Sequence, residues 1–208
     1  MKSENQDGAD VVRCIKEIAR MLYDFLGETV WNDPANEKMA EKFQRIQLMA
    51  ADTPVQLRPE SKPVVRYWEE VLSVASNGRL GPLVDLFREI TPYLCWMDDP
   101  DYRGESVDEE FLRNYGCFEL VGTRGIIRDD QVTLGCLLLS PEIFFPFHAH
   151  PGNELLYLMH GRGIWHMDQG QIISIPKESH ILIPENQIHA FWSVGEQALA
   201  ALYVCAGD

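Results

Sequence analysis

Four side chains in the second half of the chain have the types and spacing of a metal site. His148, His150 and Glu154 fall within one short stretch, and His189 follows later in the sequence. Residues two apart in a strand share a face, so His148 and His150 are expected to point together into a barrel. Glu154 would lie on the same face if the regular strand continues that far. A turn over residues 184–186 would fold His189 back beside them.

Three neutral imidazoles and one carboxylate form a donor set for a borderline divalent cation. Such nitrogen and oxygen ligands suit Zn, Fe(II), Mn, Co or Ni, and they leave positions open for water or substrate. All six histidines of the chain lie between residues 148 and 189. The sequence therefore predicts one divalent metal ion in a site of catalytic type. His160 is expected at a turn, and His166 and His180 are expected to be surface or hydrogen-bonded structural residues.

The elements that must position these side chains change in character along the chain. Helical periodicity over residues 11–25 ends at Gly27, and further helices are predicted from Asp33-Pro34, over 62–76 and from Gly81. After residue 116, short runs rich in β-branched and aromatic residues alternate with turn residues, which is typical of a jelly roll. The predicted fold class is α+β, with a helical region over 1–116 packed on a β-barrel over 117–208. The acidic stretch 98–110 is expected to be an exposed loop or the cap of a short helix near Phe111.

Composition excludes several function classes. The 208 residues include 32 acidic and 18 basic side chains, for a net charge of −14. Such a charge repels nucleic acids and anionic membranes. The five cysteines are far apart and include no C-x-x-C pair, so reduced thiols are expected rather than disulfides. Neither a membrane span nor an export signal is predicted, which favours a cytoplasmic protein. The expected partner is a small-molecule substrate, and exposed edge strands make a homodimer plausible.

The motif His148-x-His150-x3-Glu154-x6-Gly161 resembles the first motif of the cupins. Pro184-x-Asn186-x2-His189 resembles the second motif more loosely, because a glycine is usual in place of Asn186. The usual glycine six residues before the first histidine is also replaced, by Glu142. A helical half before a single barrel is similar to the bacterial dimethylsulfoniopropionate lyases. That resemblance implies the two histidines, the glutamate and the later histidine as ligands of a divalent metal, and β-elimination to dimethyl sulfide and acrylate as the reaction.

One departure from this family concerns the base that removes the α-proton. The family usually has a tyrosine two residues after the glutamate, where this chain has Leu156, followed by Tyr157. Tyr157 is the first candidate for the catalytic base, although its parity directs it away from the metal unless a bulge follows Glu154. Tyr203, or Tyr93 and Tyr102 from the helical half, are the alternatives.

A cationic substrate would be held by aromatic faces in the barrel. By strand parity, Phe144 and Phe191 are expected to share the face of the histidines, whereas Phe145, Phe147 and Trp192 are not. Two other functions remain open: a cupin dioxygenase or isomerase that uses Fe(II) or Mn on the same four ligands, favoured by the missing tyrosine, and a non-enzymatic module that binds a small ligand.

Overall fold

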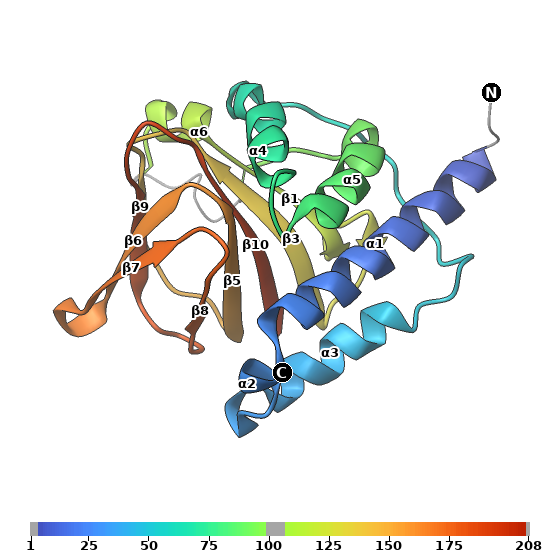
Figure 1. Cartoon of the computed structure of the whole chain (residues 1–208), viewed down its shortest axis with the longest axis horizontal. Coiled ribbons are helices and arrows are strands. Elements are labelled where there is room, and N and C mark those ends of the chain that lie inside the picture. Colours follow the sequence, from blue (N-terminus) through green and yellow to red (C-terminus); the bar gives the residue numbers. More distant parts are fainter. Residues whose placement is uncertain (1–3, 99–106, 207–208) are drawn as a thin grey trace.

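The computed structural model describes residues 4–98 and 107–206, and in this range the α-helices precede the strands (Figure 1). The α-helices are α1 (Glu4–Leu26), α2 (Glu28–Trp31), α3 (Glu37–Gln47), α4 (Trp68–Ala75), α5 (Gly81–Ile90) and α6 (Glu109–Asn114). Short 3₁₀ segments lie at η1 (Pro34–Asn36), η2 (Pro63–Tyr67), η3 (Thr91–Tyr93) and η5 (Asp168–Gly170).

The predicted helices form for the local reasons that their sequences indicate. Helix α1 ends before Gly27, whose φ of +73° is the left-handed conformation that glycine adopts without strain. Pro63 begins η2, so the predicted helix over 62–76 opens with 3₁₀ turns before it continues as α4. Asp108 caps α6 by accepting a hydrogen bond from the backbone N–H of Phe111, as expected for a capped helix there. Residues 99–106 of the acidic stretch lie outside the described residues.

Ten strands lie in the described part of the second half. They are β1 (Tyr115–Gly122), β2 (Ile127–Arg128), β3 (Val132–Leu139), β4 (Phe144–His148), β5 (Asn153–His160), β6 (Arg162–Met167), β7 (Ile172–Pro176), β8 (His180–Ile183), β9 (His189–Ser193) and β10 (Leu199–Ala206). One sheet has the order β2-β1-β3-β10-β5-β8, and the other has the order β4-β9-β6-β7. All pairs except β1 with β2 are antiparallel. The two sheets form a jelly-roll barrel, and the α+β prediction is confirmed.

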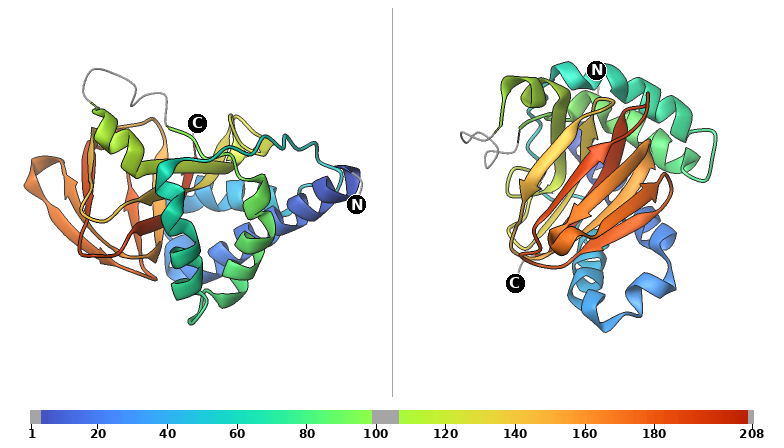
Figure 2. Two further views of the ribbon diagram at one scale, coloured as in Figure 1. Left: turned by 90° about the horizontal axis from the view of Figure 1, so that it is seen from above. Right: turned by 90° about the vertical axis from the view of Figure 1, so that its left-hand side faces the viewer.

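Helices α1, α3, α4 and α5 cover the outer face of the six-stranded sheet, and the four-stranded sheet lies on the far side of the barrel (Figure 2). Helix α3 packs on β10, and α4 packs on β5. One continuous hydrophobic core joins α1, α3, α4 and α5 to the outward-facing residues of β1, β3, β5 and β10. The first strand begins at Tyr115, next to the predicted boundary at residue 116. The helical region therefore buries its apolar faces against the barrel.

A second core fills the barrel between the two sheets. Trp165, Phe191 and Phe145 stack in its centre, with ring centroids 4.7 and 4.5 Å apart for the successive pairs. These rings support the strands that carry the histidines. Within the residues described, no helix is both long and apolar enough to cross a membrane.

Candidate metal centre

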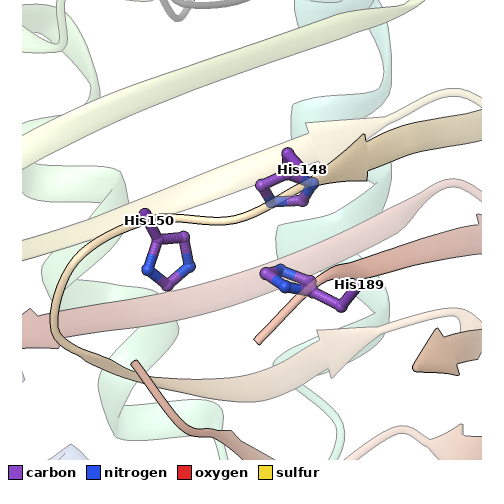
Figure 3. Close-up of side chains that lie close together, drawn as sticks. All are labelled: His148, His150 and His189. Carbon is purple, nitrogen blue, oxygen red and sulfur yellow. The ribbon is translucent and has the colours of Figure 1, made fainter. Parts of the chain in front are cut away.

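Three histidines meet inside the barrel, as Figure 3 shows. His148 ends β4, His189 begins β9, and these two residues lie opposite each other in the antiparallel pair. His150 lies in the loop after β4 rather than in the strand, so the chain turn and not the pleat brings it to the site. One nitrogen from each ring can be chosen so that all three lie within 4.8 Å of one another, which makes the triad a potential metal site.

Glu154 reaches the same place from the opposite sheet. It is the second residue of β5, and its Oε2 lies 3.2 Å from His150 Nε2 and 3.6 Å from His189 Nε2. The carboxylate is buried, with 8% of its residue surface exposed. The loop over residues 149–152 connects the two sheets, and so the four residues singled out in the sequence come together.

Backbone carbonyls orient two of the imidazoles. His148 Nδ1 lies 2.9 Å from the carbonyl oxygen of Pro146, and His189 Nδ1 lies 2.9 Å from that of Gln187. A carbonyl can only accept, so each Nδ1 carries a proton, and in the neutral imidazole Nε2 then presents its lone pair to the site. His189 Nε2 is buried and has no hydrogen-bond partner among the described residues. An orphaned imidazole lone pair beside a carboxylate fits a bound cation.

The electrostatics of the cluster favour the cation-binding form of His148 and Glu154, whereas a cation at His150 would have to replace the proton shared with Glu154. Burial, together with the nearby His189, lowers the pKa of His148 to about 4. Burial would raise the pKa of Glu154, but the adjacent His150 and His189 outweigh it and lower this pKa. Burial lowers the pKa of His150, but the contact of this imidazole with the Glu154 carboxylate outweighs burial, so the pKa of His150 is raised. At neutral pH the site therefore holds a carboxylate and a neutral His148.

A β-bulge in β4 changes which aromatic side chains face the site. The register shifts between Phe145 and His148, so three steps along β4 match two steps along β9. Phe145 consequently points inward against Phe191, with 3% of its surface exposed, while Phe144 is turned to the surface. The parity prediction for Phe144 and Phe145 was wrong because it assumed a regular strand. The prediction for Phe191 and for the exposed Trp192 is confirmed.

A pocket of about 340 Å³ opens beside the cluster. Its lining comes from β1, β3, β4, β5, β9 and β10, from the turn after β1 and from the loop after β4. The lining residues are Tyr115, Cys117, Glu119, Thr123, Arg124, Thr133, Leu137, Phe145, His148, His150, Glu154, Leu156, Phe191, Tyr203 and Cys205. The pocket thus combines members of the histidine and glutamate cluster with apolar and aromatic walls, an arrangement suited to a small organic ligand.

A partly buried ion pair joins β1 to the turn that follows it, on one wall of the pocket. Arg124 Nη2 lies 2.8 Å from Glu119 Oε1, and the backbone N–H of Arg124 donates to Glu119 Oε2 at 2.9 Å. The Glu119 side chain has only 4% of its surface exposed. Sequence reasoning missed this pair, although a glutamate inside the otherwise apolar run FELVG was an available signal. The pair leaves no uncompensated charge from Glu119 on that wall.

Tyr157 does not line this pocket. No register shift occurs between Glu154 and Tyr157 on β5, so the tyrosine lies on the opposite face of the sheet. It is buried in the core shared with the helices, where its ring stacks on Phe25 at 6.1 Å. Tyr203, one of the alternatives from the sequence, does line the pocket, as does Tyr115. Tyr102 falls outside the described residues.

The remaining histidines take no part in the cluster. His160 is buried at the end of β5, and its Nδ1 lies 2.8 Å from the carbonyl oxygen of Ala198. His166 lies on the outer face of the four-stranded sheet beside Phe144, and His180 is exposed. His160 precedes a glycine with positive φ, as a turn requires, so the structural role predicted for all three is consistent with their positions.

Residues 35–200 match the dimethylsulfoniopropionate lyase family. The chain belongs to that family. Among the relatives, the putative dimethylsulfoniopropionate lyase DddL of Cereibacter sphaeroides is 28% identical over 100 residues, which are 48% of this chain and 41% of the relative. Dimethylsulfoniopropionate lyase DddQ of Ruegeria pomeroyi is 22% identical over 107 residues, which are 51% of this chain and 53% of the relative. The matches thus span about half the length of these relatives.

Solved structures show the same fold. A chain from the crystal structures of the DMSP lyases RdDddP and RnDddQII has a TM-score of 0.64 and 18% identity, with 94% of this chain and 93% of that chain covered. The structure of DMSP lyase DddQ from Ruegeria pomeroyi has a TM-score of 0.61 and 19% identity, with 85% and 93% covered. The resemblance of the sequence to cupin-type lyases is confirmed, including the helical region that precedes the barrel.

Proposed function

We propose that this member of the family is a metal-dependent lyase that cleaves dimethylsulfoniopropionate to dimethyl sulfide and acrylate. The observation that carries the proposal is the convergence of His148, His150, His189 and Glu154 at the edge of a small pocket. Those four side chains would hold one divalent ion, for which Zn, Fe(II), Mn, Co and Ni are the candidates. The ion would neutralise the substrate carboxylate and stabilise the negative charge that develops on it as the α-proton leaves.

The aromatic wall of the pocket suits the other end of the substrate. Phe145, Phe191 and Tyr115 line the same space as the metal cluster, and the ring centroids of Phe145 and His148 are 4.9 Å apart. Aromatic faces attract a sulfonium cation through their ring quadrupoles. We therefore assign the sulfonium group to this wall and the carboxylate to the metal end.

Removal of the α-proton needs a base, and the pocket offers two phenols. Burial raises the pKa of Tyr203 well above its usual value, which makes this phenol harder to ionise. Its hydroxyl also lies 3.4 Å from the carbonyl oxygen of Phe118, on the β1 side of the pocket. We favour Tyr115 as the base, because its ring packs edge-on against Phe145, whose ring centroid in turn lies 4.9 Å from that of His148.

The test is headspace dimethyl sulfide from the purified protein, loaded in turn with each candidate metal and given dimethylsulfoniopropionate. His150→Ala and Glu154→Ala should each sharply reduce bound metal in elemental analysis, whereas His166→Ala, outside the cluster, should not. Full metal occupancy in both site variants would contradict the ligand assignment. Absence of dimethyl sulfide with every metal would contradict the lyase assignment.

The base is tested by two matched variants. Tyr115→Phe should lower kcat by about a hundredfold or more, the usual contribution of a positioned general base, and should leave bound metal unchanged. Tyr203→Phe should have a smaller effect. A larger loss of kcat in Tyr203→Phe than in Tyr115→Phe would identify Tyr203 as the base.

Leu156 at the family's usual tyrosine position supports a second candidate, an oxygen-dependent or isomerising reaction at the same cluster. Oxygen uptake by the Fe(II)-loaded protein in the presence of small carboxylates would favour it. Release of dimethyl sulfide without oxygen uptake would rule out the oxygen-dependent reaction.

A further inference from the structure

The two oxygens of the Glu154 carboxylate have different surroundings. Oε2 faces the imidazoles of His150 and His189. Oε1 faces the neighbouring strand, where Cys205 Sγ lies 3.7 Å away. Cys205 is directly opposite Glu154 in the pairing of β10 with β5, so the register of the sheet places this thiol beside the carboxylate.

A buried carboxylate in a metal site needs its outer oxygen held if the inner oxygen is to point reliably at the ion. Partners outside the ligand set supply this orientation in metal proteins, and their loss typically costs about 10- to 100-fold in metal affinity. The S–H group is a weak donor and a carboxylate oxygen is an acceptor, so the contact has the polarity of a hydrogen bond from Cys205 to Glu154.

We propose that Cys205 is a positioning residue for the metal centre: its thiol donates to Glu154 Oε1 and thereby directs Oε2 toward the histidines. This inference rests on the metal site of the proposed function, and it extends that site to a residue of β10. Cys205 acts through Glu154 and is not itself a ligand of the ion.

The experiment uses the full chain with Cys205→Ala, Cys205→Val and Cys205→Ser. Zn²⁺ dissociation constants are measured by competition with a chromophoric chelator, and thermal unfolding of the metal-free proteins checks the fold. Cys205→Ala and Cys205→Val should bind Zn²⁺ at least about tenfold more weakly, as expected for the loss of an outer partner. Cys205→Ser restores a donor and should recover most of the affinity. Cys117→Ala is the matched control, because Cys117 lines the same pocket while its thiol contacts the carbonyl oxygen of Met97.

Three results would overturn the inference. One is wild-type affinity in both Cys205→Ala and Cys205→Val, and another is an equal loss in Cys205→Ser. The third is a sulfur-to-cobalt charge-transfer band in the Co²⁺ protein that disappears in Cys205→Ser, because this would make Cys205 a ligand. A wild-type protein that binds no metal would overturn the metal centre as well. Weaker metal binding in the Ala and Val variants, without any dimethyl sulfide release by the wild type, would uphold the inference and reject only the lyase reaction.

Discussion

The variant Tyr157→Phe tests whether this tyrosine is the catalytic base, as the sequence suggests, or a residue of the core between the barrel and the helices, where the structure places it. The residue is 1% exposed, and its ring packs nearly parallel to that of Phe25, at an interplanar angle of 23°. Its hydroxyl is buried and has no hydrogen-bond partner in the described part of the chain. Burial also raises the pKa of this phenol, which makes it a poorer base at neutral pH.

The size of the effect follows from the missing hydrogen bond. A buried polar group without a partner costs about 1–3 kcal/mol, and Tyr157→Phe removes that cost while keeping the ring. We expect the free energy of unfolding to rise by about 1 kcal/mol, which is about 2–4 °C in Tm for a chain of this size. Tyr157→Ala, which also removes the ring, should instead destabilise the protein by about 3–5 kcal/mol.

The assays are thermal unfolding and initial rates of dimethyl sulfide release at equal metal content. Tyr157→Phe should keep kcat within about twofold of the wild type, because a general base contributes a hundredfold or more and this residue is not expected to be one. A hundredfold drop in kcat with unchanged Tm and metal content would refute the reasoning. It would mean that β5 presents Tyr157 to the pocket during turnover.

Two further predictions concern the charges of the site. In the metal-free protein, burial lowers the pKa of His148 to about 4, below its unfolded value near 6.5. The unfolded chain therefore binds more protons over this range, and His148 should reduce the free energy of unfolding by about 3 kcal/mol as the pH falls from 7 to 4. Urea unfolding of the wild type and His148→Gln should show this difference, and parallel pH profiles would contradict it. Arg124→Ala should destabilise the protein by about 1–3 kcal/mol because it removes the guanidinium from the buried Glu119 carboxylate, which then keeps the backbone N–H of residue 124 as its donor. A loss below about 1 kcal/mol in urea unfolding at pH 7, where Glu119→Gln with Arg124→Met is the compensated control, would show that the carboxylate is solvated.

The elements of the fold were predictable because their signals are local. Apolar spacing of three and four residues marks α1 and α5, and Gly27 marks the end of α1. Short β-branched and aromatic runs mark the strands of the barrel. The short separation of His148, His150 and Glu154 forces these residues to remain neighbours in almost any compact fold, so a metal site was a sound hypothesis from the sequence.

The pocket was harder to predict because it is assembled from strands far apart in the chain. Glu119 and Tyr203 approach the same space through the pairing of β1 with β3 and of β3 with β10. A Cβ at Gly135, between them, would come within 2.5 Å of the Tyr203 hydroxyl oxygen, so the absence of a side chain there makes room for the ring. No spacing in the sequence reports such a lateral contact.

The sequence by itself determined the donor types, the order of helices before strands and the family motif, because each depends on residues close together along the chain. The tertiary structure decided the rest. A single bulge in β4 turned Phe145 inward and Phe144 outward, and the unbroken register of β5 kept Tyr157 on the helical side. Side chains alternate between the two faces of a strand, so one inserted residue reverses the assignment. Only the paired strands show where that insertion lies.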